Sequence, residues 1–160
     1  FINLITAILA SIVISFFDAT IEQLVALAVL MPIVASMGGN AGTQTLTVAV
    51  RALAMKEISG ANTLRIIWKE SLVGSLNGIL FALITGTITA LWFTNPMLGI
   101  VIGLAMIVNM LVAGLFGAAI PIALSSRGAD PAVSSTVFLT TLTDIVGFFV
   151  FLGLAAMLLI

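Results

Sequence analysis

Five long apolar segments make up most of this sequence, and a few charged residues separate them. Hydrophobic residues account for 62% of the 160 residues and charged residues for only 7%. An ordinary water-soluble domain is about a quarter charged, so this chain has too few charges to cover a surface that faces water. The sequence predicts an all-α membrane protein with a single domain, 1–160. The segments run over residues 1–17, 24–53, 72–93, 97–124 and 131–160.

The basic residues predict how the chain is oriented in the membrane. All five lie in or beside the connections that follow the second and fourth segments: Arg51, Lys56, Arg65, Lys69 and Arg127. Because lysine and arginine favour the cytoplasmic side, we expect five transmembrane helices with the N-terminus in the cytoplasm and the C-terminus outside. Asp18 and Glu22 then lie at the outer surface. There they either attract cations to the mouth of a pathway or are ordinary solvated acids.

Asp144 lies in the middle of the last apolar segment. It follows Pro131 by 13 residues, which at about 1.5 Å per residue is about 20 Å along a helix, well inside a hydrocarbon core of about 30 Å. An ionised carboxylate costs about 2.5–3.5 kcal/mol or more there, so it usually faces a wet cavity or a partner. Thr136, Thr140 and Asp144 form one polar stripe, with Thr143 beside it. We interpret the stripe as the lining of a cation pathway; the alternative is a neutral acid buried for packing alone.

A glycine-rich polar stretch interrupts the second segment. Residues 37–47 contain three glycines and five polar side chains, which would weaken an isolated helix. One helical face of this stretch could stand opposite Asp144, and it carries Asn40, Thr43, Gln44 and Thr47. We interpret it as pathway lining, with helix packing alone as the alternative. For Asn109, in the fourth segment, the sequence leaves open a hydrogen bond to another helix and contact with a hydrated ion.

The residue types that are missing exclude several functions. The chain has no cysteine and no histidine, which excludes thiolate sites, disulfides and the commonest general base. An aspartyl protease needs two deep carboxylates, and Asp144 is the one acid predicted to lie at depth. We therefore predict that the protein is not an enzyme. Any metal that it binds must be a hard cation held by oxygen. Mg²⁺ suits such a site because it keeps much of its hydration shell, which hydroxyls and amides can contact.

A single deep carboxylate per chain suggests that two chains pair. Two-fold symmetry is the commonest arrangement of oligomers. Two Asp144 side chains across such an axis would give two negative charges to one divalent cation. We therefore expect a homodimer in contact with membrane lipid, with Mg²⁺ as the bound ion and Mn²⁺, Ca²⁺ or another divalent cation as alternatives, and no nucleic acid partner.

Two motifs resemble those of a known family. The run from Met31 to Gln44, which includes Gly38-Gly39-Asn40 and is followed by Arg51-Ala52-Leu53, resembles the second membrane helix of the MgtE family of magnesium transporters. The run from Asp130-Pro131-Ala132 to Thr140-Thr141-Leu142-Thr143-Asp144 is similar to that family's fifth helix. The two motifs stand in the family's order, and the five-span layout agrees.

This resemblance implies a homodimeric, Mg²⁺-selective channel with its pore at the dimer interface and Asp144 as the central acid. It also implies that Asp130 lies at the cytoplasmic mouth, near a further Mg²⁺ site. Family members usually have cytosolic regulatory domains before the first helix, so we expect this chain to be part of a longer protein of a prokaryotic inner membrane. We therefore expect metal contacts at Asp144, Thr140 and Asp130. We expect pore lining at Thr136, Thr143, Asn40, Gln44 and Asn109.

Two other functions fit the same residues. The first is a carrier of the same ions that couples their transport to Na⁺ or H⁺, with Asp144 titrating during the cycle. The second is a membrane anchor for soluble domains, in which Asp144 affects stability alone.

Overall fold

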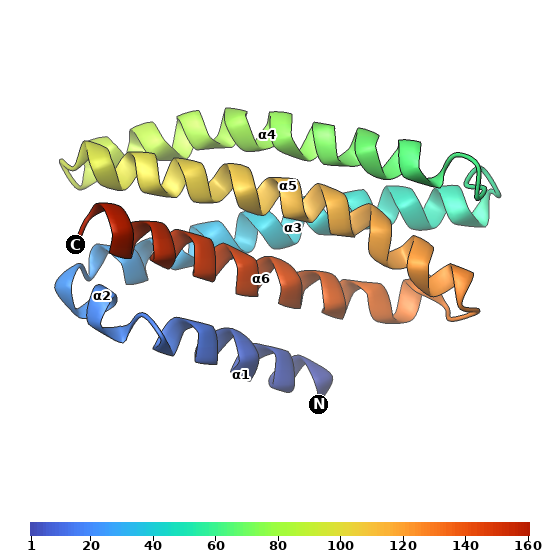
Figure 1. Ribbon diagram of the computed structural model, residues 1–160, viewed down its shortest axis with the longest axis horizontal. Helices are drawn as coiled ribbons and strands as arrows, with labels where there is room; N and C mark the ends of the chain where they lie inside the picture. The colour runs from blue at the N-terminus through green and yellow to red at the C-terminus, as the bar shows by residue number, and fades with distance from the viewer.

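A computed structural model describes the backbone of all 160 residues and every side chain except those of Val133 and Ser134. All of the regular structure in it is helical, as the sequence predicted (Figure 1). The elements are α1 (Ile2–Ser15), α2 (Asp18–Gln23), α3 (Ala26–Ala54), α4 (Thr63–Trp92), α5 (Pro96–Ser126) and α6 (Pro131–Leu158).

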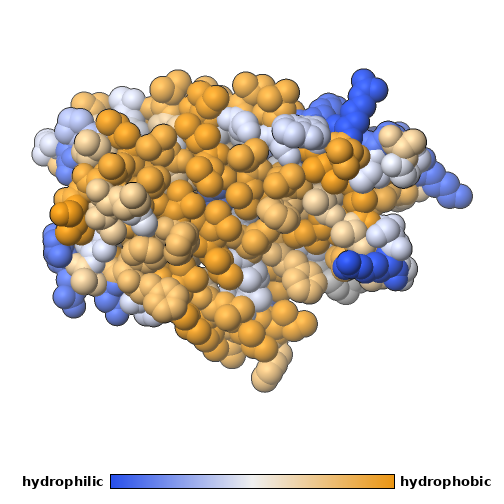
Figure 2. Space-filling model, in the orientation of Figure 1, coloured by the Kyte–Doolittle hydropathy of each residue, from blue (hydrophilic) through white to orange (hydrophobic). Residues whose placement is uncertain are grey.

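Four helices are long and apolar enough to cross a membrane. They are α3, α4, α5 and, within α6, Ser135–Leu158. The surface between the two ends of the bundle is largely apolar, and hydrophilic residues gather at both ends (Figure 2). The first predicted span forms α1, which has 14 residues. That corresponds to about 21 Å, less than the hydrocarbon core of about 30 Å. Four of the five predicted spans are therefore found.

Two helices begin with a side-chain cap. The side chain of Asn95 caps α5, accepting a hydrogen bond from the Leu98 amide (3.1 Å). The Oδ1 of Asp130 caps α6, accepting from the Ala132 amide (2.9 Å). In each case a proline follows at the first helical position, where the amide hydrogen that proline lacks would have had no partner.

The centre of the bundle is α5, which packs against α3, α4 and α6. Small residues bring α4 into backbone contact with it. A Cβ at Gly74 would lie 2.5 Å from the Met110 carbonyl oxygen and 3.2 Å from the Gly114 Cα. In lipid, such close approach replaces the hydrophobic effect as the source of helix association. The helix α1 packs on α6, at the side away from α4 (Figure 1).

Candidate cation pathway

A row of polar side chains lies exposed on α3 in the middle of a membrane-length helix. We call Ser36, Asn40, Gln44 and Thr47 the α3 polar face; all four are exposed on the surface of the single chain. Asn40 donates to the Ser36 hydroxyl (3.3 Å), and the Thr47 hydroxyl donates to the Thr43 carbonyl (2.8 Å). The Asn40 amide and the Thr47 hydroxyl each use a donor within α3, and their oxygen lone pairs remain available to accept hydrogen bonds from outside.

The predicted stripe on α6 is also present at the surface. Thr136 is exposed, and Thr140 and Asp144 are half-buried. The Thr140 hydroxyl donates to the Thr136 carbonyl (3.0 Å), so its lone pairs remain free to accept hydrogen bonds from a hydrated cation. Thr143 differs from the other three. It is fully buried within the chain, and its hydroxyl donates to the Thr140 carbonyl (3.0 Å).

The two polar rows run along neighbouring helices. Gly39 of α3 faces Thr140 of α6, and a Cβ there would lie 3.9 Å from the Thr140 Cγ2. One turn further along α3, Gly42 packs against Leu139. The absence of side chains at these two glycines lets the helices approach beside Asn40 and Thr140. The structure therefore brings the α3 polar face and the α6 stripe to the same helix contact.

Gln44, at one edge of the α3 polar face, also lines a cavity of about 160 Å³ between α3, α4 and α5. Two further polar residues that line it, Glu70 and Asn77, had no role in the sequence analysis. The third predicted segment starts at residue 72, after Glu70, whereas α4 begins at Thr63 and includes it. The start of α4 could have been found from the polar pair Asn62-Thr63 in front of an apolar run.

Asn109 is fully buried, and its Nδ2 donates to the Val34 carbonyl of α3 (2.9 Å). Of the two roles that the sequence left open for this residue, the structure supports the hydrogen bond to another helix. The side chain is not on the surface that carries the polar rows.

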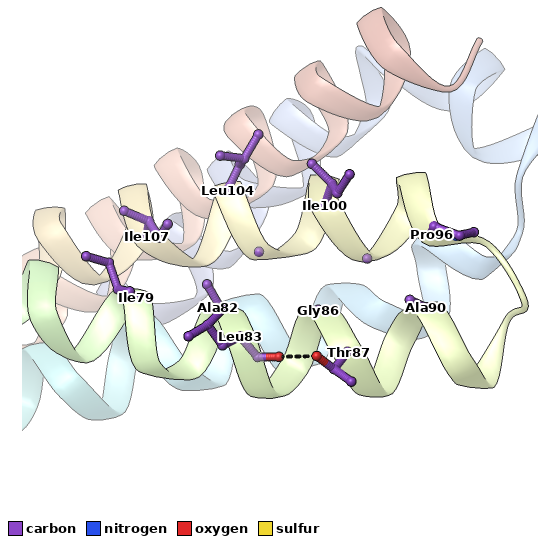
Figure 3. A pocket seen from close by; sticks show the side chains of 12 residues that line it. Ile79, Ala82, Leu83, Gly86, Thr87, Ala90, Pro96, Ile100, Leu104 and Ile107 are labelled. Carbon is purple, nitrogen blue, oxygen red and sulfur yellow. Dashed lines mark hydrogen bonds between the residues drawn. The ribbon is translucent and has the colours of Figure 1, made fainter.

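An apolar groove of about 360 Å³ follows the seam between α4 and α5 (Figure 3). Thr87 is the one lining residue with a polar side chain, and its hydroxyl donates to the Leu83 carbonyl of its own helix (2.7 Å). This groove offers no side-chain group to a cation, in contrast to the contact between α3 and α6.

A family model described as a divalent cation transporter, MgtE, matches residues 31–154. The chain belongs to the MgtE family. Curated relatives named magnesium transporter MgtE include one from Enterococcus faecalis, which is 39% identical over 144 residues and is aligned with 90% of this chain. Those from Bacillus subtilis and Thermus thermophilus are 32% and 33% identical, over 95% and 99% of the chain. The chain spans 32% to 35% of the length of these relatives.

The region that matches the MgtE family contains both polar rows, all of α4 and α5, and most of α3 and α6. The family match and the apolar helices together make this a multi-pass membrane protein. Asp18 and Glu22, the predicted outer acids, precede the matched region and are exposed on α2. In Figure 1, α2 lies at the opposite end of the bundle from the connections that carry the basic residues.

Asp130 is exposed in this MgtE-family chain at the same end as the basic residues, and its described contact is the cap of α6. Among the side chains that the structure describes, no three acids gather to form a ready-made metal site.

Proposed function

We propose that this chain is the membrane part of a magnesium transporter, in which two copies form a pore and hydrated Mg²⁺ moves down its electrochemical gradient. The observation that supports this most is the exposure of Asn40 and Gln44 in the middle of the membrane-length helix α3. Polar side chains at that depth are expensive next to lipid, so they usually face protein or water. The relatives' names give the ion: they are magnesium transporters.

A second copy would remove these polar side chains from lipid. If the α3–α6 contacts of two chains face one another across a two-fold axis, two Asp144 carboxylates lie on opposite sides of a central path. One divalent cation would then compensate both negative charges, which repel each other when the path is empty. Asp144 is the central site in this proposal. Asn40, Gln44, Thr136 and Thr140 line the path.

Magnesium suits these ligands because it dehydrates reluctantly and usually keeps several waters. Hydroxyl and amide oxygens on α3 and α6 can accept hydrogen bonds from those waters without replacing them. Thr143 and Asn109, which are buried in the single chain, act in this proposal from behind the lining. Asp130 would attract cations at the mouth.

We further propose that the end of the bundle with the five basic residues faces the cytoplasm. The helix α1 is apolar and packs on α6, so in this proposal it is part of the first of five membrane segments. Asp18 and Glu22 would then lie at the outer mouth.

The test is Mg²⁺ flux into liposomes that contain the reconstituted protein, comparing wild type with Asp144→Asn and Asp144→Ala. Both variants should lose most of the saturable flux, because the central charge is gone. Glu57→Gln removes an exposed carboxylate in the connection between α3 and α4, outside the proposed path, and is the control. Wild-type flux in both Asp144 variants would remove that residue from the mechanism. Imposed Na⁺ or pH gradients should change the flux only through the voltage, which separates a channel from a coupled carrier.

A further inference from the structure

Asn109 of α5 is a buried amide that contacts both helices of the proposed pore lining. Its Nδ2 donates to the Val34 carbonyl of α3 at 2.9 Å. On the other side it meets Gly147 of α6, where a Cβ would lie only 2.8 Å from the same nitrogen. A single side chain therefore links α3, α5 and α6 in the interior of the bundle.

Two glycines on two different helices leave the space that this amide occupies. A Cβ at Gly38 of α3 would collide with Nδ2 and would lie 2.8 Å from the Asn109 Cγ. A Cβ at Gly147 would also lie 3.2 Å from the Cγ1 of Val34. Alanine at either glycine would displace the amide, the helix or both. The separation of α3 and α6 at this level is therefore fitted to Asn109.

The other end of the amide, Oδ1, has no hydrogen-bond partner among the described atoms, although it is buried. An unpaired buried acceptor lowers stability, whereas an apolar side chain of the same shape would not have this cost. Leucine has a similar shape and would fill the site without an orphan acceptor. Packing by itself therefore does not explain an asparagine at this position.

We infer that Asn109 is a positioning residue, which fixes α3 and α6 at the separation that the proposed pore needs. Gly147 lies three residues from Asp144, about one helical turn, and Gly38 lies two residues from Asn40. If α6 shifted against α3 at the amide, Asp144 would move relative to the α3 polar face. Removing a group that orients the direct ligands of a metal typically lowers metal affinity or activity by about 10–100-fold. This inference rests on the proposed function.

The first test replaces Asn109 by leucine, which keeps the branching and the number of heavy atoms of the side chain and removes the hydrogen bond. Thermal unfolding of the purified protein measures the fold. Fluxes of Mg²⁺ and Ca²⁺ into liposomes measure the pore. We expect Asn109→Leu to unfold within a few degrees of wild type. Its Mg²⁺ flux, or its preference for Mg²⁺ over Ca²⁺, should fall by about tenfold or more. Met106→Leu, fully buried on the same helix, should change neither.

The second variant combines Asn109→Ala with Gly147→Ala. It keeps the test decisive if the Asn109→Leu variant does not fold. It removes the amide and fills part of its space from α6. If Asn109 only packs, this double variant has wild-type stability, Mg²⁺ flux and preference for Mg²⁺ over Ca²⁺. If Asn109 positions the helices, the double variant is about as stable as wild type, but its preference for Mg²⁺ over Ca²⁺ stays lowered.

Wild-type flux and selectivity in a folded variant would overturn the inference. So would failure of both variants to fold, because Asn109 would then serve the fold itself. Asp144→Asn measured in parallel separates the two proposals. If it abolishes flux while the Asn109 variants behave as wild type, the pore stands and the positioning role falls.

Discussion

Gly42 of α3 packs directly against Leu139 of α6, and a Cβ on that glycine would lie 3.0–3.1 Å from three carbons of the leucine side chain. Leu139 is fully buried, so its neighbours limit how far it can move away. Gly39, one turn earlier on the same face, has more space: the contact to Thr140 Cγ2 would be 3.9 Å. The helix contact that carries both polar rows is thus tight at one glycine and relaxed at the other.

This difference predicts that Gly42→Ala and Gly39→Ala will behave differently. Both gain up to about 1 kcal/mol from the better helix propensity of alanine. Gly42→Ala also introduces overpacking, which typically costs about 1–3 kcal/mol. We expect Gly42→Ala to lower the thermal unfolding temperature in detergent and Gly39→Ala to leave it unchanged or raise it. Equal unfolding temperatures for the two variants would mean that the α3–α6 contact is looser than described.

The seam between α4 and α5 gives a second, independent comparison. A Cβ at Gly114 would lie 2.5 Å from the Glu70 carbonyl oxygen, a backbone atom that cannot move alone. At Gly103 the nearest atom would be the Ala82 carbonyl oxygen, at 3.4 Å. Gly114→Ala should therefore destabilise the protein by about 1–3 kcal/mol or more, and Gly103→Ala by much less. Thermal unfolding checks this; a Gly114→Ala variant as stable as Gly103→Ala would contradict the packing of α4 on α5.

The sequence was sufficient to predict features that depend on local chemistry. The segment predicted from residue 131 forms α6, and the segment predicted from residue 97 forms α5, which begins at Pro96; each start is marked by a polar residue in front of a proline and an apolar run. The close packing of α4 on α5 follows from glycines that recur at helical spacing, such as Gly74 and Gly78. These signals involve a few neighbouring residues, so they could be recognised without knowing the tertiary structure.

Which side of a helix faces inward could not be predicted in the same way. Lipid is as apolar as the protein interior, so hydropathy does not separate Thr140, which is half-buried, from Thr143, which is fully buried. The role of Asn109 depends on Val34, 75 residues earlier in the chain. The membrane segment of α1 was expected from composition, whereas the described helix has 14 residues.

Asp130 has two possible roles that a pair of substitutions can separate. As a helix cap, its carboxylate can be replaced by serine or asparagine, whereas alanine should cost about 1 kcal/mol. As a cation-binding group at the mouth, it needs its charge. We expect Asp130→Ala to lower the unfolding temperature and Asp130→Asn to preserve it. If Asp130→Asn keeps stability but lowers Mg²⁺ flux in liposomes, the charge serves the cation as well as the helix. Wild-type stability in Asp130→Ala would show that the cap contributes nothing measurable.

The α3 polar face should be wet in the membrane, and this can be tested directly because the chain has no cysteine of its own. A thiolate reacts with charged, membrane-impermeant reagents, whereas a thiol next to lipid stays protonated and inert. Asn40→Cys should therefore be modified in native membranes, and Mg²⁺ should slow the reaction by occupying the path. The matched control is Leu83→Cys on α4, a site that is 67% exposed on the single chain but apolar. Because α4 presents it beside the apolar groove of Figure 3, it should not react. Equal modification of the two cysteines, or no effect of Mg²⁺ on Asn40→Cys, would place the water elsewhere.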